Sequence, residues 1–192
     1  AVICTGGFVA GPTAIAASLL KVPLFFHESN SYPGLVTRKM AKKINTIFIS
    51  FENSKKYLVK AKTVNYGIPL RQSKISSTQK TFELSSLGLD NNKPTIIVSG
   101  GSQGSIAINT VVSSAIPVIL SMGYQIIWQT GKTSYERFAT KHKNTEGVYM
   151  FAFSPELPKM LSKCKLAITR AGAMTIAELE ENCIPAILIP LP

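Results

Sequence analysis

Short apolar segments alternate with amphipathic stretches of about ten residues along the chain, and this change of period predicts strands that alternate with helices. The apolar segments are apolar on both faces, which is typical of parallel strands covered by helices on each side. The pattern therefore predicts an α/β fold. The predicted strands are residues 23–27, 46–51, 63–66, 95–99, 125–129, 148–153, 165–169 and 186–189. The predicted helices are residues 12–20, 34–43, 54–58, 104–122, 134–142, 156–163 and 174–182.

A polar segment interrupts this pattern between Pro69 and Pro94, where residues 71–80 contain few apolar side chains. Because the charge density also changes there, we predict two α/β lobes, residues 1–72 and residues 73–192. A doubly wound domain usually has about 100 to 150 residues. We therefore expect both lobes to be truncated, the second one at its C-terminal end, since the sequence stops directly after a predicted strand.

Basic residues are concentrated in the first lobe. The net charge is +11, and residues 1–80 contain twelve Lys or Arg against two acidic residues, whereas residues 81–192 contain nine against eight. Lys39, Lys42 and Lys43 lie in a basic run that is interleaved with apolar side chains, so we expect a folded basic surface. Such a surface attracts nucleic acid, an anionic membrane or phosphorylated substrates, or it only keeps the protein in solution. No RNA-binding motif accompanies it, which argues against nucleic acid.

Several other classes of protein and site are disfavoured. No apolar run approaches the roughly 20 residues that span a bilayer, and the first residues do not form a signal peptide. Cys4, Cys164 and Cys183 are odd in number and lack CxxC spacing, which argues against a disulfide framework or a zinc site. We expect all three to be buried free thiols. His142 lies between two lysines and is expected at the surface.

A glycine-rich turn, Gly100-Gly101-Ser102-Gln103-Gly104, joins the strand at residues 95–99 to a long helix. Glycines let the backbone approach a ligand closely, and the exposed amides of a helix N-terminus point at an anion. A diphosphate suits this arrangement, and the hydroxyl of Ser102 can add a hydrogen bond. The turn is neither a GxGxxG with a downstream acid nor a P-loop, which disfavours nicotinamide cofactors and ATP hydrolysis. A tight turn that binds no ligand is the alternative.

A second turn of this kind, residues 170–175, follows the strand at residues 165–169. The amides of Ala173 to Thr175 could face a phosphate, and Glu178 could accept two hydrogen bonds from a ribose diol. An acidic residue near a helix N-terminus is also common without any ligand. Because both turns follow parallel strands at their carboxyl ends, they predict a nucleotide-binding crevice together.

Further polar residues lie near predicted strand ends in the first lobe. His27 and Glu28 end a strand and could move a proton, although a hydrogen-bonded structural His is the simpler interpretation. Asn30 could bind a sugar hydroxyl. Arg71 stands at the boundary between the lobes and could reach a ligand, or it is an exposed linker residue. A third glycine-rich turn, Gly6 to Gly11, could face the same cleft.

The motifs resemble, in order, those of the MurG family of N-acetylglucosaminyltransferases, and the similarity extends over essentially the whole chain. They are Gly6-Gly7-Phe8-Val9-Ala10-Gly11-Pro12, His27-Glu28-Ser29-Asn30 with Pro33-Gly34-Leu35, Gly67-x-Pro69-x-Arg71, Gly100-Gly101-Ser102-Gln103-Gly104, Gln129-x-Gly131, and Arg170-Ala171-Gly172-Ala173-x-Thr175 with Glu178. The resemblance implies an inverting GT-B glycosyltransferase with two Rossmann-like lobes. It assigns residues 1–72 to the acceptor- and membrane-facing lobe and residues 73–192 to the UDP-sugar donor lobe.

The resemblance also implies the reaction. N-acetylglucosamine would pass from UDP-N-acetylglucosamine to undecaprenyl-diphosphate-N-acetylmuramoyl-pentapeptide, converting lipid I to lipid II for peptidoglycan, with no metal and no cofactor. The enzyme would work as a peripheral protein at the cytoplasmic face of the bacterial membrane. Lys39, Lys42 and Lys43 are candidates for contact with anionic lipid and with the diphosphate of the acceptor.

The donor contacts that the resemblance implies are Asn30, Arg71, Ser102, Ser154, Ala173, Met174, Thr175, Ile176, Ala177 and Glu178. Ser154 stands where the family usually has Ile. Because the family contacts the uracil through backbone atoms there, a Ser side chain is compatible with binding. Ser29 replaces the usual Gln and leaves Asn30 in place, whereas Ile68 replaces the usual Asn and changes the hinge.

Two functional segments of the family have no counterpart in this sequence. One is an opening loop with a His proposed as the general base, and the other is a Gln-containing segment that grips the donor sugar. We therefore expect an internal part of the enzyme that is inactive alone, with its catalytic base outside this sequence. The alternatives are a non-catalytic nucleotide-sugar-binding fragment and another GT-B nucleotide-sugar enzyme, and a nucleic-acid binder is the least favoured.

Overall fold

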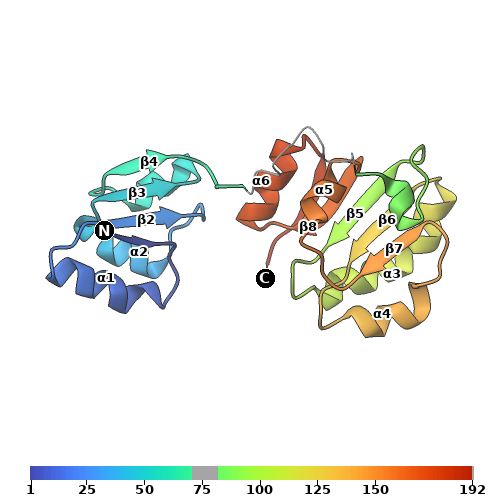
Figure 1. Cartoon of the computed structure of the whole chain (residues 1–192), viewed down its shortest axis with the longest axis horizontal. Coiled ribbons are helices and arrows are strands. Elements are labelled where there is room, and N and C mark those ends of the chain that lie inside the picture. Colours follow the sequence, from blue (N-terminus) through green and yellow to red (C-terminus); the bar gives the residue numbers. More distant parts are fainter. Residues whose placement is uncertain (71–81, 192) are drawn as a thin grey trace. The chain divides into compact units, whose positions relative to one another are not determined.

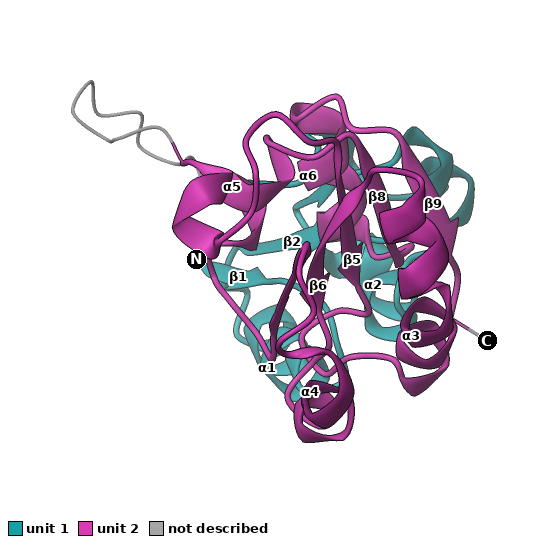
Figure 2. Ribbon diagram, turned by 90° about the vertical axis from the view of Figure 1, so that its right-hand side faces the viewer, with its two compact units in different colours: residues 1–71 teal, residues 72–192 magenta. Residues whose placement is uncertain are grey.

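The computed structural model describes residues 1–70 and 82–191 and divides the chain into two compact units, residues 1–71 and residues 72–192 (Figure 2). Each unit contains one sheet in which all neighbouring strands are parallel. The α/β class predicted from the alternating pattern is therefore confirmed.

Unit 1 is built on a four-stranded sheet with the order β1-β2-β3-β4 (Figure 1). Its strands are β1 (Val2–Cys4), β2 (Leu24–Glu28), β3 (Thr46–Ile49) and β4 (Thr63–Asn65). Its helices are α1 (Ala10–Leu19) and α2 (Leu35–Met40), and the 3-10 helices are η1 (Ala41–Lys43) and η2 (Glu52–Tyr57). Small residues of α1, among them Ala14 and Ala17, pack with Phe26 and Ile47 of the sheet in one buried core.

Unit 2 has a five-stranded sheet with the order β7-β6-β5-β8-β9. The strands are β5 (Thr95–Ser99), β6 (Gln125–Gln129), β7 (Val148–Phe151), β8 (Leu166–Arg170) and β9 (Ala186–Ile189). The helices are η3 (Leu84–Leu87), α3 (Ile106–Ser121), α4 (Tyr135–His142), α5 (Leu157–Leu161) and α6 (Ala173–Glu181). Alternate strand residues belong to two separate cores: Val98 and Trp128 pack with α3 and α4, whereas Ile97 and Ile127 pack with α5 and α6. Helices therefore cover both faces of the central strands, as predicted.

Several predicted elements need correction. Strand β1 was not predicted, because three residues are too short to show a period. Residues 54–57 lie in the 3-10 helix η2 rather than in an α-helix, and α2 changes to the 3-10 helix η1 after Met40, so the α-helix predicted at residues 34–43 is shorter than expected. Strand β9 is exposed at Ala186 to Leu188, so it is not covered on both faces, since it is an edge strand of the sheet.

Two expectations about single side chains were wrong. Cys4 and Cys164 are buried as expected, and burial raises the pKa of the Cys164 thiol to about 12, but Cys183 is exposed in the turn after α6. His142 is buried rather than at the surface: its Nε2 lies 2.7 Å from Ser113 Oγ, and its ring packs against Trp128. Burial, followed by the charge of Lys141, lowers the pKa of His142. The lysines on either side of His142 suggested an exposed position, although its side chain faces the core.

Candidate functional site

The candidate site lies where the connections of the unit 2 sheet change direction. From β5 the chain continues to β6 and β7 on one side, and later to β8 and β9 on the other side. Strands β5 and β8 pair in parallel with Ser99 opposite Thr169, so the loops that follow them begin side by side at the carboxyl edge. Open α/β sheets bind ligands at this kind of switch point. Both glycine-rich turns singled out from the sequence lie here.

The turn after β5 is held by backbone packing that requires glycine. Gly104 has a φ of 84°, and a Cβ atom on it would overlap the carbonyl oxygen of Thr130. Gly131, with a φ of 85°, fits equally tightly against the backbone nitrogen of Gly104. The turns after β5 and β6 therefore touch backbone to backbone. In this arrangement Ser102 is exposed at the surface of the turn, where its hydroxyl is open to a ligand.

Helix α3 begins at Ile106 rather than at Gly104, because the left-handed Gly104 cannot continue into a helix. Ser105 is the N-cap, and its Oγ accepts a hydrogen bond from the amide of Ile108 at 3.5 Å. Within the turn at residues 101–104, the amide of Gly101 donates to Ser99 Oγ at 3.3 Å and that of Gly104 to the carbonyl of Gly101 at 3.1 Å, so the amides of Ser102 and Gln103 are the ones left to reach a ligand. Gly101 has a φ of 88°, and no atom lies within 4 Å of the position that a Cβ would take, so there is room for a ligand beside it.

The turn after β8 offers a helix N-terminus. Helix α6 begins at Ala173 with Gly172 as N-cap, which supplies no side-chain cap, so the amides of Ala173, Met174 and Thr175 point out of the helix without an intrahelical acceptor. The N-terminal end of the helix dipole adds a partial positive charge there. This end of α6 is therefore suited to hold an anion. Ile176 and Ala177, the next two predicted contacts, are half-buried in the same helix.

Arg170 connects the two helix starts. Its Nη2 donates to Oγ of Ser105, the N-cap of α3, at 2.8 Å, and its Nη1 donates to the carbonyl of Pro190 at 2.6 Å. None of the ion pairs among the described residues includes Arg170. A guanidinium without an acidic partner thus adds positive charge at the switch point, and this contact across 65 residues could not be foreseen from the sequence.

Glu178 lies in the second turn of α6 and is half-buried. Burial raises the pKa of its carboxyl group, because charge is less stable away from water. A half-buried carboxylate beside a helix N-terminus can accept hydrogen bonds from a diol. Its position in the second turn also shows that the dipole of α6 is not the reason for an acidic residue there, since that effect is limited to the first turn.

Ser154 follows β7 at the same edge of the sheet. Its backbone amide donates to Oε1 of Gln129 at 3.2 Å, and its hydroxyl accepts from the amide of Glu156 at 3.1 Å. Nearby in the chain, the ring of Phe153 is exposed, and Nζ of Lys132 lies 5.6 Å from its centroid. Sequence reasoning missed Phe153 and Lys132, because neither belongs to a motif.

In unit 1, Asn30 lies in the loop after β2 and is held by a buried carboxylate. Oε1 of Glu28 accepts from both the backbone amide and Nδ2 of Asn30 at 3.1 Å, and its Oε2 accepts from the amide of Gly34 at 2.8 Å and from Thr37 Oγ1 at 2.9 Å. Both carboxylate oxygens are thus occupied, which argues against Glu28 as a proton carrier. Nε2 of His27 lies 3.1 Å from the carbonyl oxygen of Gly67. This contact fits the simpler interpretation of His27, a hydrogen-bonded structural residue.

The structure brings Ser102, Ser154 and residues 173–178 together in one unit, while Asn30 belongs to the other. Arg71 lies outside the described residues. Residues 1–70 and 82–191 contain no group of three His, Cys, Asp or Glu side chains placed to hold a metal ion.

The sequence matches two family descriptions. The Glycosyltransferase family 28 C-terminal domain covers residues 95–192, and the Glycosyltransferase family 28 N-terminal domain covers residues 1–49. A relative from Carboxydothermus hydrogenoformans is 34% identical over all of this chain and 52% of its own length. Its name is UDP-N-acetylglucosamine--N-acetylmuramyl-(pentapeptide) pyrophosphoryl-undecaprenol N-acetylglucosamine transferase. A relative of the same name from Bacillus subtilis is 35% identical over all of this chain and 53% of its own length. The chain thus spans about half the length of the curated relatives it matches.

Solved structures show the same architecture. MurG from Acinetobacter baumannii matches with a TM-score of 0.70 and 26% identity over 100% of this chain and 52% of its own. UDP-GlcNAc 2-epimerase from Neisseria meningitidis, bound to UDP-GlcNAc, matches with a TM-score of 0.73 over 97% of this chain and 58% of its own, and its 15% identity limits that likeness to the fold. The predicted fold of two parallel-sheet α/β lobes is therefore confirmed.

Proposed function

Because the chain belongs to glycosyltransferase family 28, we propose that its activity is the one named for its curated relatives. N-acetylglucosamine is transferred from UDP-N-acetylglucosamine to undecaprenyl-diphosphate-N-acetylmuramoyl-pentapeptide, an inverting reaction of peptidoglycan synthesis. In this proposal unit 2 binds the UDP-sugar and unit 1 faces the acceptor. The observation that carries it is the meeting of two open loop ends, after β5 and after β8, at the switch point of the unit 2 sheet.

The mechanism follows from where charge develops. The acceptor's sugar hydroxyl attacks the anomeric carbon of the donor, a new carbon–oxygen bond forms, the bond to the diphosphate breaks, and the hydroxyl proton leaves to a base. The electron pair of the broken bond stays on UDP. The amides of Ala173 to Thr175, with the hydroxyl of Ser102 and the amides of Ser102 and Gln103, supply fixed donors for that charge. One such preorganised donor typically contributes about 3 kcal/mol to the barrier reduction.

The remaining donor contacts take up the nucleoside and the sugar. Glu178 accepts hydrogen bonds from the ribose diol, and the backbone at Ser154 faces the uracil. For Asn30, in unit 1, and for Arg71, outside the described residues, the donor contact rests on the family resemblance alone. The half-burial of Glu178 supports its role, because a carboxylate that has already lost part of its hydration binds a diol with less further desolvation.

Calorimetry tests this proposal. UDP-N-acetylglucosamine titrated into the purified chain is expected to bind more tightly than GDP at least tenfold, a difference of about 1.4 kcal/mol. UDP-glucose is the second comparison: tighter binding of UDP-glucose than of UDP-N-acetylglucosamine would indicate another GT-B nucleotide-sugar enzyme. A folded chain that binds none of the three, or that binds GDP equally well, contradicts the proposal.

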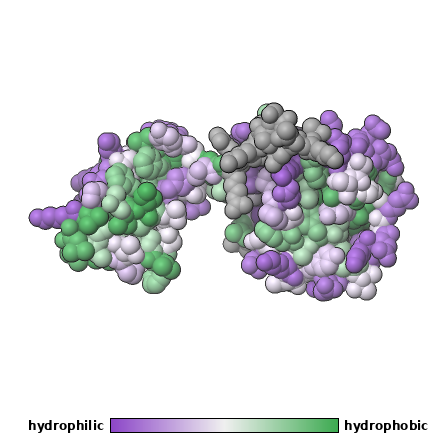
Figure 3. Space-filling view, in the orientation of Figure 1, coloured by the Kyte–Doolittle hydropathy of each residue, from purple (hydrophilic) through white to green (hydrophobic). Residues whose placement is uncertain are grey.

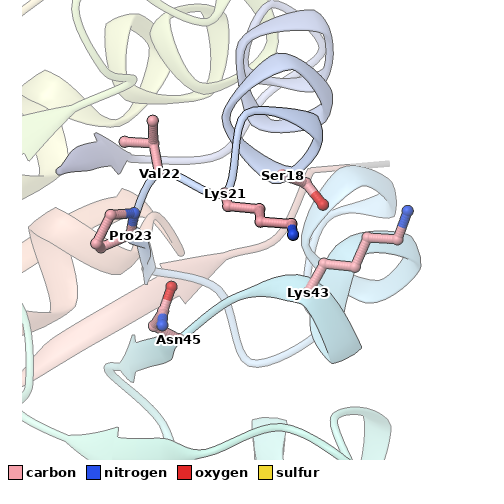
Figure 4. Close-up of a pocket in the computed structure, with 6 residues that line it drawn as sticks. All are labelled: Ser18, Lys21, Val22, Pro23, Lys43 and Asn45. Atoms are coloured by element: carbon pink, nitrogen blue, oxygen red, sulfur yellow. The ribbon is translucent and has the colours of Figure 1, made fainter.

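We further propose that unit 1 docks on an anionic membrane through the surface of α1 and the adjoining lysines. Figure 3 shows apolar side chains gathered on the face that α1 forms, and exposed apolar residues there are Phe8, Val9, Ile15, Leu19 and Leu20. Lys43 and Lys21 line a cavity of about 290 Å³ at the C-terminal ends of α1 and η1 (Figure 4). No helix in the described part of the chain has the length and apolarity needed to cross a bilayer.

Charge reversal at Lys42 and Lys43 tests this docking surface. The double variant Lys42→Glu with Lys43→Glu is expected to reduce binding to vesicles of anionic phospholipid at least tenfold, since each lysine near the surface contributes about 1 kcal/mol. Reversal of Lys55 and Lys56, which lie in η2 beyond the other end of β3, carries the same charge change and is the control. Sedimentation with vesicles measures both. Equal losses in the two double variants would mean that only net charge matters and would overturn the proposed surface.

A further inference from the structure

Two buried glutamines end the same strand of unit 2. Gln125 is the first residue of β6 and Gln129 the last, and each is 2% exposed. At the amino edge of the sheet, Oε1 of Gln125 accepts from the backbone amide of Asp90 at 3.0 Å, and Nε2 of Gln125 donates to Thr95 Oγ1 at 2.9 Å. Gln125 therefore fixes the segment that leads into β5, far from the switch point.

Gln129 makes the equivalent contacts at the carboxyl edge. Its Nε2 lies 3.1 Å from Ser99 Oγ and 3.4 Å from the carbonyl oxygen of Gly101, and its Oε1 accepts from the amide of Ser154 at 3.2 Å. Ser99 Oγ also accepts from the amide of Gly101 at 3.3 Å. One side-chain amide thus joins the loop after β5 to the loop after β7.

We propose that Gln129 is a positioning residue for the nucleotide: it fixes the Gly101–Ser102 turn and the Ser154 backbone relative to each other, so that the diphosphate and the base are bound at a set spacing. This inference rests on the proposed function. The loop after β5 carries the candidate diphosphate contact, Ser102, and the loop after β7 carries the candidate base contact. No other side chain among the described residues has a hydrogen bond to both loops.

The contacts require a neutral amide. One end of the side chain donates to a carbonyl and a hydroxyl, and the other end accepts from a backbone N–H, so neither a carboxylate nor an apolar side chain can replace it. Because Gln129 is buried, removal of its side-chain amide leaves the Ser154 N–H without its partner, whereas the Gly101 carbonyl keeps the amide of Gly104 at 3.1 Å. The two loops then separate or shift to recover hydrogen bonds with water.

The substitution Gln129→Met, which keeps length and removes the hydrogen bonds, tests the inference by calorimetry with UDP. The Kd of UDP is expected to rise about tenfold, the effect of one unsatisfied buried group. The matched control is Gln125→Met, because Gln125 has the same burial, the same strand and the same kind of contacts at the opposite edge. It is expected to lower the Tm by a similar amount and to leave the Kd of UDP unchanged.

A merely structural role for Gln129 predicts a different outcome: both variants lose stability and neither loses affinity, which would overturn the inference. Should Gln129→Met not fold, Ser99→Ala decides, since it removes the hydroxyl at the end of β5 that links Gln129 Nε2 to the amide of Gly101; a two- to fivefold rise in Kd is expected, and an unchanged Kd would contradict the role. Failure of the proposed function is distinct, because the unaltered chain would then not bind UDP at all, and the role of Gln129 would fall with it.

Discussion

Replacement of Gly104 by alanine is expected to lower the free energy of unfolding of unit 2 by about 3 kcal/mol or more. The added Cβ would overlap the carbonyl oxygen of Thr130 and would lie 2.9 Å from Cα of Gly131. Both neighbours are backbone atoms and cannot rotate away. The left-handed φ of 84° adds strain for any residue with a side chain. Relief therefore requires the loops after β5 and β6 to separate, which would also disrupt the candidate diphosphate site.

Urea unfolding followed by tryptophan fluorescence measures this loss, because the single tryptophan, Trp128, is fully buried in unit 2. The control is Gly123→Ala: Gly123 has a φ of 83° but no atom within 4 Å of an added Cβ. It is expected to cost only the backbone term, about 1 kcal/mol. Equal losses for the two variants would show that the contact between the two loops is not tight in solution.

The substitution Glu178→Ala is expected to raise the Kd of UDP about 30-fold, because two hydrogen bonds from the ribose to a carboxylate are lost. Glu181→Ala is the control, since Glu181 is exposed at the end of the same helix, α6. Calorimetry with 2′-deoxy-UDP completes the test: the loss caused by Glu178→Ala should be smaller for this ligand, which has one hydroxyl fewer. An equal loss for both ligands would contradict a diol contact.

Glu178 also predicts a pH dependence. Its pKa is raised by burial, and the carboxylate is the form that accepts two hydrogen bonds. UDP affinity should therefore be constant above the raised pKa and decrease as the pH is lowered through it. In Glu178→Gln this decrease should disappear. A decrease of equal size in both proteins would assign it to another group, such as the diphosphate itself.

The central strands of the fold follow from local sequence. Strands β5 and β6 have the predicted bounds, since buried apolar runs between turn residues are a strong local signal, and the exposed edge strand β9 has them too. The errors occur where the surroundings decide. His142 has lysines on both sides in the chain, yet it lies four residues after Phe138 on the buried face of α4, and only the packing against Trp128 reveals this.

The candidate site is predictable in part for the same reason. Its glycine-rich turns are local motifs, so the sequence places them at strand ends. The contacts that hold the turns in position join residues far apart: Gln129 reaches Ser154 across 25 residues, and Arg170 reaches Ser105 across 65. Such contacts depend on strand order and register, which a single sequence does not display. The packing of Gly104 on Gly131 likewise becomes visible only in three dimensions.

The position of the UDP site can be mapped directly by following the backbone amide resonances of the isotope-labelled chain while UDP is added. We expect the largest shifts at the amides of residues 173–175, at the turn of residues 101–104 and at Ser154, which all lie at the carboxyl edge of the unit 2 sheet. Shifts confined to other parts of the chain, or no shifts in a folded chain, would contradict a donor site at the carboxyl edge of β5 and β8.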